Sequence, residues 1–590
     1  MRFRFPFSWR FRRWLRTREQ SEYALTIFYA LLIGGGVGVV GALFYRVLLL
    51  VQKFFFRASE EDFASLPGLT LLLVPIFGGV IQAALTRMYP DVASRKGVVE
   101  VMKSLKLKQG VISAGTTLFH MVAPVIAIGT GGSVGPEGPA CQLGAGIASR
   151  IGQMFRVSPG RLKVMVAAGS GAAISAIFNA PLGGVFFALE IILLNDLKDV
   201  TFGVLILASV VANVVSHALL GGHSLFQFPP LELPAVRLLP IFLLLGMLGG
   251  LLSVGFMKWS GTLAKLVWGR WRNVPRWVFP PLAGLLLGIT AQWFPDVLGV
   301  GYHGIQTALS GEYVLLVGLA LLVLKVLLTG TTIELGGFGG TFAPSLFIGA
   351  MLGGVVAQLA AMLHLPISAP LLVLTGMGTV LAGMNGIPLT AFLLLVELTG
   401  NYDMVLPMMI AVSGTTMVIQ FIVHERSLYI FKLKKARLYS EKDGATMLAE
   451  TSIRELMKPM KPVVKSSSPL QTVVPLFAEL DLKDLVVVDE ANRVTGMLDF
   501  ADLRHIIAEF EALKIIRVAE LAETVPIVHA ETSLAEFQFL ARDCHSEYLP
   551  VCDRDGQLLG IVFQSAVNGM AQTILRSQQE EQENNRWAFK

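Results

Sequence analysis

Long apolar segments constrain the fold of this chain more than any other feature of its sequence. They cover residues 24–51, 68–88, 110–130, 162–195, 236–262, 313–330, 342–364, 368–395 and 404–424. Many of them reach the ~20 residues that an α-helix needs to cross the hydrocarbon core of a bilayer. Only 15% of the 590 residues are charged, whereas soluble globular domains carry about 25%. We therefore expect a protein that crosses a membrane several times.

The charges are distributed unevenly along the chain. Residues 1–440 carry 33 bases and 18 acids, and residues 441–590 carry 15 bases and 24 acids. Residues 1–18 contain seven Arg and no acid, which predicts a cytoplasmic N-terminus by the positive-inside rule. The Phe and Trp residues between these arginines favour a position in the lipid headgroup layer. Arg continues to residue 18 without a small-residue cleavage pattern, which argues against a secretory signal peptide.

The composition divides the chain into six segments. We expect a cytoplasmic or interfacial segment (1–22), an all-α polytopic membrane domain (23–432), a charged linker (433–450), two soluble α/β units (451–510 and 511–576) and a polar tail (577–590). The two α/β units share residues at an offset of 64: Leu470, Asp489 and Gly496 match Leu534, Asp553 and Gly560. Such a repeat predicts two copies of one unit. It resembles a tandem pair of cystathionine-β-synthase (CBS) domains, a regulatory module.

The membrane region also repeats. Five residues of the first half recur 207 positions later: Gly169, Gly171, Pro181, Leu182 and Glu190 match Gly376, Gly378, Pro388, Leu389 and Glu397. Pro139 and Gly144-Ala145 match Pro344 and Gly349-Ala350 at an offset of 205. Many transporters are built from two such halves, with the substrate site at their interface near the bilayer midplane. The offsets leave open whether the halves are parallel or inverted.

Two Gly- and Pro-rich segments occupy equivalent places in the two halves. They read GTGGSVGPEGP at 129–139 and GGFGGTFAP at 336–344, and each precedes an apolar, small-residue helix. Irregular backbone survives inside a bilayer only when it is buried in protein or lines a water-filled cavity. Two helix N-termini that converge there would offer free N–H groups and positive dipole ends. The pattern predicts an anion site, with a kinked packing motif as the alternative.

Glu137 lies within the first of these segments. An ionisable group inside a membrane indicates a functional role by default. An ionised carboxylate would compete with an anion for the same N–H donors, and protonation would release it. We therefore expect Glu137 to gate the site; the alternative is a structural Glu that caps the helix.

Four motifs in order resemble the signature set of the chloride channel and transporter (CLC) family. They are GPEGP at 135–139, FNAPLGGVFFALE at 178–190, GGTFAP at 339–344 and the Tyr of RSLYIF, Tyr429. The resemblance covers nearly the whole chain, including the CBS pair. It implies two inverted halves with broken helices, and a homodimer with a separate pore in each subunit.

The resemblance also implies roles for individual residues. Glu137 is similar to the external gating glutamate of the family. Thr341 and Phe342 resemble the residues whose amides bind the central anion, and Tyr429 resembles the hydroxyl donor to the same ion. Gly138 and Gly340 fall in the same anion-binding motifs. The expected function is therefore transport of chloride or other small anions, either channel-like and weakly proton-coupled or as a H⁺-coupled antiporter.

Three departures from the family pattern bear on mechanism. Arg95-Lys96-Gly97 stands where the family's first anion motif has Gly-Ser-Gly, so Lys96 takes the place of the serine. Three alternatives stay open: Lys96 points into the pore, as an anion ligand together with Gly97; it points to water; or the alignment is shifted by one residue. Ile191 follows Glu190 where proton-coupled members often carry an intracellular glutamate, which favours loose coupling. The first CBS copy has Asp502 where such modules hold a ribose, and the second has Ala566. One adenine-nucleotide site at Asp502 and a purely structural, dimer-packing CBS pair both stay open.

Other classes of protein fit the sequence less well. A CBS-regulated divalent cation transporter needs several carboxylates in its spans, and a membrane enzyme needs a nucleophile with a base or a metal cluster. Cys141, Cys544 and Cys552 form no CxxC pair and lie near no His cluster, so we expect free thiols and no metal site. We expect a non-enzymatic protein without a required cofactor or nucleic-acid partner, in contact with membrane lipid. Its predicted place is the plasma membrane, specifically a bacterial inner membrane, with both termini cytoplasmic.

Overall fold

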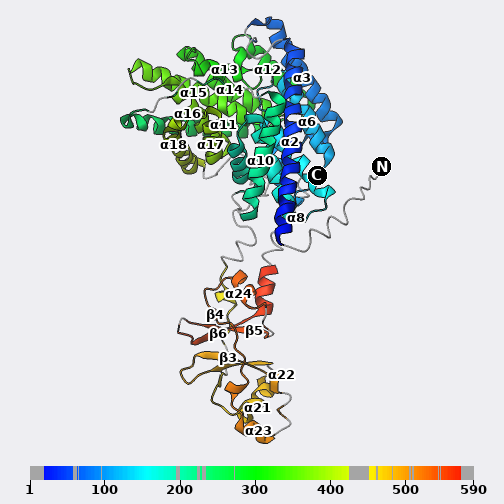
Figure 1. Cartoon of the computed structure of the whole chain (residues 1–590), viewed down its shortest axis with the longest axis vertical. Coiled ribbons are helices and arrows are strands. Elements are labelled where there is room, and N and C mark those ends of the chain that lie inside the picture. Colours follow the sequence, from blue (N-terminus) through cyan, green and yellow to red (C-terminus); the bar gives the residue numbers. More distant parts are fainter. Residues whose placement is uncertain are drawn as a thin grey trace. The chain divides into compact units, whose positions relative to one another are not determined.

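The computed structural model divides the chain into two compact units, residues 1–433 and 434–590. Within them it describes residues 19–423 and 451–572, apart from residues 58–62, 64, 95, 195–198, 222–225, 229–230, 232–233, 272, 460–462, 481–482, 504–505, 508–509, 543, 545 and 554. The first unit is helical and the second combines small sheets with helices (Figure 1). This confirms the expected all-α membrane domain followed by an α/β regulatory part.

The membrane unit is built from apolar helices of unequal length. They are α2 (Glu19–Phe56), α3 (Gly68–Met88), α4 (Pro90–Ala93), α5 (Gly97–Leu107), α6 (Ala114–Gly129), α7 (Glu137–Met154), α8 (Pro159–Phe178), α9 (Pro181–Phe187), α10 (Asp199–Leu220), α11 (Leu239–Lys265), α12 (Phe279–Ala291), α13 (Tyr302–Leu309), α14 (Leu315–Glu334), α15 (Phe342–Met362), α16 (Ala369–Asn385), α17 (Pro388–Thr399) and α18 (Val405–Val423). Among the described residues, eight helices are long and apolar enough to span a bilayer. Five further apolar helices are shorter, which is typical of broken helices.

The structure divides two segments that the sequence presented as continuous apolar runs. The run at 162–195 breaks at Asn179, and the run at 368–395 breaks at Gly386; both residues are left-handed, with φ of 53° and 68°. The two breaks lie 207 positions apart and each precedes a Pro-Leu helix start. The sequence analysis missed one spanning helix, α10.

The repeated glycines pack the helices of each half in the same way. A Cβ on Gly144 would lie 2.1 Å from the carbonyl oxygen of Gly169, and one on Gly349 would lie 2.3 Å from that of Gly376. Real Cβ atoms do not approach an oxygen this closely, so α7 packs on α8, and α15 on α16, only because these positions lack a side chain. Each half therefore contains the same close helix pair.

Two repeated glutamates connect the halves. Glu190 accepts hydrogen bonds from the amides of Leu389 (2.9 Å) and Thr390 (2.8 Å), in the first turn of α17. Glu397 accepts from the amides of Leu182 (2.8 Å) and Gly183 (2.8 Å), in the first turn of α9. A carboxylate satisfies amides that a helix cannot satisfy itself and complements the helix dipole.

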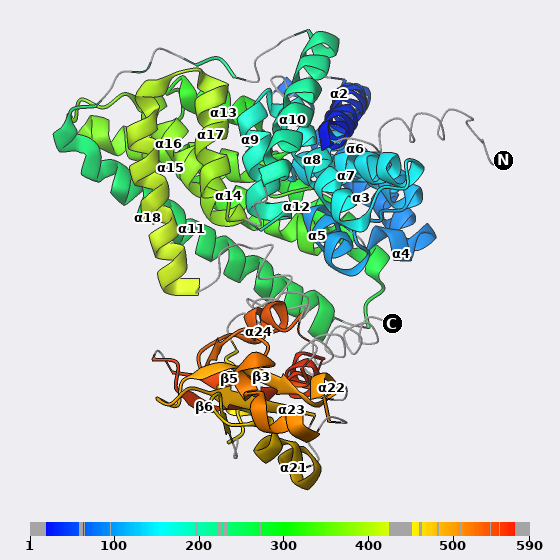
Figure 2. The same ribbon diagram turned by 60° about the horizontal axis from the view of Figure 1, so that its bottom comes forward.

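These reciprocal contacts show how the halves are related. Each half gives the other the contact that it receives, as expected for two halves related by an approximate two-fold axis. Figure 2 shows α2, α3, α6 and α7 in blue and cyan on one side of the unit, and α15 to α18 in green and yellow on the other.

The second unit contains two copies of one strand–helix–strand–strand pattern. The copies consist of β1 (Val464–Lys465), α21 (Leu470–Leu480), β2 (Asp484–Val488), β3 (Val494–Asp499), α22 (Phe500–Leu503) and α23 (Phe510–Ile515), and of β4 (Val528–His529), α24 (Leu534–Leu540), β5 (Tyr548–Cys552) and β6 (Leu558–Phe563). In each three-stranded sheet the first pair of strands is parallel and the second antiparallel. Each register pair of the first sheet recurs in the second at an offset of 64, and so does the irregularity after Val487, which recurs after Val551.

The two copies share an apolar core. Val486, Val488 and Met497 of the first copy pack with Tyr548 and Ile561 of the second. The Tyr548 hydroxyl also donates a hydrogen bond to the main-chain oxygen of Asp484. The copies therefore form one paired module.

Candidate functional site

The two Gly- and Pro-rich segments meet inside the membrane unit. The amide of Gly135 donates to the oxygen of Gly340 (2.9 Å), and the amide of Gly340 donates to the oxygen of Gly135 (2.7 Å). The two residues form an isolated antiparallel bridge and lie 205 positions apart. This pair places the start of α7 beside the start of α15.

Both segments leave the preceding helix by the same turn. Gly131 after α6 and Gly336 after α14 have φ of 90° and 103°, a conformation that only glycine adopts easily. The next residue in each, Gly132 and Gly337, donates to the oxygen of the residue five positions earlier, at 2.8 Å in both cases. The glycines therefore turn the chain back so that the two helix N-termini converge.

Glu137 is the first residue of α7 and is 1% exposed. Its carboxylate lies against Gly135, because a Cβ built on Gly135 would come within 2.1 Å of Oε2. It interacts with the main chain of Ala343 and of Glu137 itself, yet neither oxygen has a hydrogen-bond partner of normal geometry among the described residues. A buried carboxylate without such partners is costly, so this arrangement calls for an explanation.

Four other residues expected at the anion site, Gly138, Gly340, Thr341 and Phe342, belong to the two segments that meet at this bridge. A Cβ on Gly340 would lie 3.0 Å from the amide nitrogen of Gly138, so these two backbones are in contact. The Thr341 hydroxyl donates to Oδ1 of the buried Asn385 (2.7 Å). Phe342 begins α15, and its ring lies 5.0 Å from that of Phe178. The first-turn amides of α7 and α15 have no intrahelical acceptors and carry the positive ends of helices of 18 and 21 residues.

The structure shows neither of the two orientations considered for Lys96. Its ammonium donates to the oxygens of Gly336 (2.7 Å) and Gly337 (3.1 Å) and lies 4.4 Å from the centre of the Phe338 ring. It thus ties the start of α5 to the turn that leads into Gly340. A carbonyl pair and an aromatic face both attract a cation. Direct binding of an anion by Lys96 remains a prediction.

The amide of Gly97 also has a partner within the protein. It donates to Oε1 of the buried Gln142 on α7 (2.7 Å). Gly97 has a φ of 60°, and a side chain there would strain the turn into α5. The hydrogen bond between Gly97 and Gln142 therefore links α5 to α7.

Two buried polar residues that the sequence analysis did not single out have equivalent contacts in the two halves. Nε2 of His120 lies 3.0 Å from the oxygen of Val92, and the ammonium of Lys325 donates to that of Val297 at 3.0 Å. His120 and Lys325 lie 205 positions apart in the sequence, and so do their partners Val92 and Val297. Lys325 is fully buried and also donates to Gly299 (3.1 Å). A single charge in the apolar run LLVGLALLVLKVLLTG was the signal that could have identified it.

The remaining expected residues lie elsewhere. Ile191 is fully buried in a π-helical turn, Ala188–Ile192, that follows α9. Asp502 lies on α22 and is exposed. Tyr429 lies outside the described residues. Among the residues that the structure describes, no group of three His, Cys, Asp or Glu side chains could hold a metal ion.

Comparisons with known proteins agree with this geometry. Residues 78–420 match the family model of the voltage gated chloride channel, and residues 453–509 match the CBS domain model. Chloride channel protein CLC-e of Arabidopsis thaliana is 33% identical over 67% of this chain, which spans 60% of that relative's length. The H(+)/Cl(-) exchange transporter ClcA of Vibrio cholerae is 27% identical over 69% of this chain and 88% of its own length.

Solved structures share the fold. A slow cyanobacterial Cl⁻/H⁺ antiporter superposes with a TM-score of 0.63 at 22% identity and covers 70% of this chain and 97% of its own. A eukaryotic CLC transporter superposes with a TM-score of 0.59 at 18% identity and covers 92% of this chain and 97% of its own. With the match to the family model over residues 78–420, these comparisons show that the chain belongs to the voltage-gated chloride channel (CLC) family.

Proposed function

We propose that this protein carries chloride or other small anions across a membrane and that Glu137 gates the pathway. The observation that supports this most strongly is the buried Glu137 carboxylate, which has no hydrogen-bond partner of normal geometry and lies where the N-termini of α7 and α15 converge. An ionised carboxylate in this place stands in for a bound anion. Protonation removes its charge and lets an anion replace it at the helix ends.

The site suits weak, reversible binding. Its donors are the amides of Gly138, Thr341 and Phe342, with the aromatic rings of Phe342 and Phe178 beside them. Helix ends attract an anion without a full positive charge, so the ion is stabilised and can still leave. We include Tyr429 as a further hydroxyl donor on the basis of the family resemblance.

We further propose that transport is channel-like or only weakly coupled to protons. Ile191, where proton-coupled members often carry an acid, is fully buried and cannot bind a proton. The acid beside it, Glu190, is held by three hydrogen bonds to Leu389 and Thr390 and is committed to the fold. H⁺-coupled antiport is the second candidate, and the similarity to an H⁺/Cl⁻ exchange transporter favours it.

The assembly and regulation follow from the resemblance. We propose a homodimer with one pathway per subunit, in a bacterial inner membrane, with both termini cytoplasmic. An adenine nucleotide at the exposed Asp502 belongs to the same proposal and is not needed for transport.

The test is chloride flux from liposomes with simultaneous proton recording. Glu137→Gln and Glu137→Ala are expected to raise flux several-fold and to abolish most of its pH dependence, because neither side chain can compete as an anion. The exposed Glu312→Gln serves as the matched control. Unchanged flux and pH response in both Glu137 variants would contradict the gate.

The same recordings separate the two modes of transport. For the channel-like mode, a chloride gradient drives little uphill proton movement in the unmodified protein. Robust proton pumping at a fixed stoichiometry would establish the antiporter instead.

A further inference from the structure

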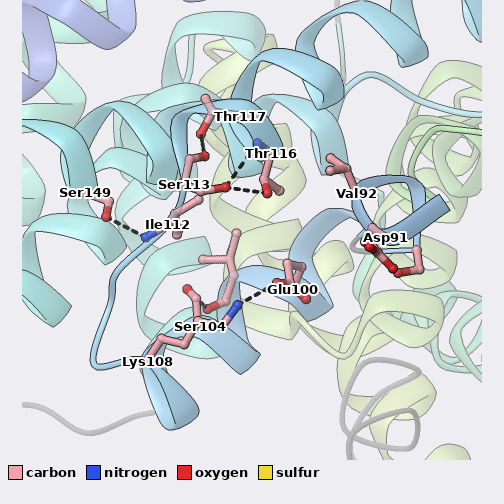
Figure 3. Close-up of polar contacts among 12 residues, drawn as sticks. Asp91, Val92, Glu100, Ser104, Lys108, Ile112, Ser113, Thr116, Thr117 and Ser149 are labelled. Atoms are coloured by element: carbon pink, nitrogen blue, oxygen red, sulfur yellow. Dashed lines mark hydrogen bonds and ion pairs between the residues drawn. The ribbon is translucent and has the colours of Figure 1, made fainter. Parts of the chain in front are cut away.

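A cavity of about 370 Å³ lies where the C-terminal ends of α5 and α7 meet the start of α6. It is lined by Glu100, Ser104, Lys108, Val111, Ile112, Ser113, Ala114, Thr116, Arg150 and Gln153. Figure 3 shows Glu100 and Ser104 on α5 and Lys108 just after its end, opposite Ser113 and Thr116 at the start of α6. None of these residues belongs to the site around Glu137.

The loop that forms one wall of the cavity is firmly docked. The amide of Ile112 donates to the Ser149 hydroxyl (2.9 Å), which in turn donates to the oxygen of Gly110 (2.7 Å). Gln153 also donates to the oxygen of Ile112 (3.3 Å). The cavity is therefore a preformed feature of the fold.

The charges in the cavity favour an anion. Lys108 and Arg150 are cationic, and Glu100 is the single acid among the lining residues, so the lining carries a net charge of +1. Glu100 lies 3.9 Å from the Lys108 ammonium, which places Lys108 within the cavity. Arg150 is exposed and makes no hydrogen bond or ion pair with the residues that the structure describes.

The start of α6 adds neutral donors to the same wall. The Ser113 hydroxyl accepts from the amide of Thr116 (3.3 Å), and the Ser113 oxygen accepts from the amide of Thr117 (3.1 Å). The amides of Ala114 and Gly115 precede them in the first turn, where no intrahelical acceptor exists. They add to the attraction that the two cations exert.

The position of the cavity along α7 fits the level of the lipid headgroups. From the Gly135–Gly340 bridge, α7 extends over 18 residues, about 27 Å, to Met154, which exceeds the ~15 Å from the middle of the hydrocarbon core of a bilayer to its edge. The next residue, Phe155, packs against Phe28 and Tyr29 near the start of α2, at ring distances of 6.0 and 5.5 Å. Such aromatic groups mark a membrane–water interface.

Apolar side chains are exposed in the lining of the cavity and next to it in the chain. Val111, which lines it, is 44% exposed, and Met154, which follows the lining residue Gln153 in the sequence, is 67% exposed. A ligand with a charged head and an apolar body fits this combination better than a free ion.

We propose that this cavity binds the phosphate of an anionic phospholipid headgroup, with Arg150 and Lys108 as the charged contacts. The net charge of +1 matches a phosphodiester with a single negative charge, such as that of phosphatidylglycerol. Basic pockets between membrane helices commonly bind lipid headgroups in this way. The arginines of residues 1–18 precede the start of α2 in the sequence, and the positive-inside rule assigns this end of α2 to the cytoplasm.

The experiment measures lipid binding to the full-length protein in an uncharged detergent. Dihexanoyl-phosphatidylglycerol is titrated while thermal stability is followed, with dihexanoyl-phosphatidylcholine and inorganic phosphate as parallel titrations. Arg150→Gln and Lys108→Gln should each raise the apparent Kd for phosphatidylglycerol about fivefold, and together roughly 30-fold, since each cation near a lipid headgroup contributes comparably. Lys163→Gln, which removes an exposed charge from the start of α8 outside the cavity, should leave the Kd within about twofold.

Each outcome decides the proposal. Arg150→Lys keeps the charge and should keep most of the affinity, which separates a charge effect from misfolding. Equal affinity in the unmodified protein and the double variant would overturn the proposal. Equal stabilisation by inorganic phosphate would make a free phosphate the ligand and would overturn the lipid. The readout does not depend on anion flux, so it tests this site separately from the gate.

Discussion

The two halves of the membrane unit share one backbone arrangement but differ at a few side chains. Glu190 and Glu397 are identical, and each caps a helix of the other half. Where the first half has Glu137, the second has Phe342, 205 positions later, although both residues begin a helix at the Gly135–Gly340 bridge. Residues that repeat therefore hold the halves together, whereas Glu137, for which we propose the role of gate, has no counterpart in the second half.

The largest expected effect concerns the repeated glutamates. Glu190→Ala and Glu397→Ala should each lower the free energy of unfolding by about 2–4 kcal/mol, because two helix-end amides lose a charged acceptor. The two losses in free energy of unfolding should be of similar size. The loss for Glu190→Ala should be the slightly larger one, because Glu190 also accepts a hydrogen bond from the Thr390 hydroxyl at 2.6 Å. Denaturation of the full-length protein in detergent measures it, with Glu312→Ala as control. An unchanged free energy of unfolding in one of the two variants would show that the halves are not held together reciprocally.

The next comparison concerns the buried tethers, where the halves use different residues for the same contact. Lys325→Met should cost about 1–3 kcal/mol, because the oxygens of both Val297 and Gly299 lose their donor. His120→Leu removes a single hydrogen bond, to the oxygen of Val92, and should cost about 1 kcal/mol. The same denaturation series checks this order. An equal or larger loss of stability for His120→Leu would contradict this order, which rests on the number of hydrogen bonds that each variant removes.

Replacing Lys96 should reduce stability less than the changes above, but it should alter the selectivity among anions. Lys96→Ser releases the oxygens of Gly336 and Gly337, and the turn that leads to Gly340 and Thr341 loses a tether. Since Lys96 is only partly buried, the stability loss should stay near 1 kcal/mol. The ratio of chloride to nitrate flux in liposomes should change several-fold, while Lys103→Ser should leave it unchanged. An unaltered ratio with a large loss of stability would assign Lys96 a purely structural role.

The smallest effect extends the comparison to the CBS pair, where Asp484 of the first copy corresponds to Tyr548 of the second. Burial raises the pKa of Asp484 above its usual range, so the folded unit binds a proton more tightly than the unfolded chain. Stability contributed by this proton is present below about pH 4, the usual pKa of Asp, and is lost as pH rises through the raised folded value.

The test replaces the ionisable group. Asp484→Asn keeps an acceptor for the amide of Glu547 but cannot ionise. It should slow hydrogen exchange slightly in β2 and β3 of the full-length protein at neutral pH and should flatten the pH dependence of that exchange. A variant that exchanges faster at every pH would show that the carboxylate is needed in its charged form.

Much of this molecule was predictable from local sequence. Apolar length predicted the spans, and the 64-residue and 207-residue offsets predicted the paired α/β copies and the two halves. The Gly- and Pro-rich segments identified the backbone that converges at Gly135 and Gly340, since glycine alone tolerates those turns and contacts. The span Phe202–Leu220 in α10 was overlooked, although its mean hydropathy of 2.1 is high enough to predict it.

The sequence by itself determined the class of protein, its repeats and the position of Glu137, because length, periodicity and glycine conformation act over a few neighbouring residues. Only the tertiary structure decided which groups meet. Lys96 contacts oxygens 240 and 241 positions away, and Glu190 contacts amides 199 and 200 positions away. A buried charge or helix end must find a partner when no water is available, and the partner is set by how the two halves pack rather than by any neighbour in the chain.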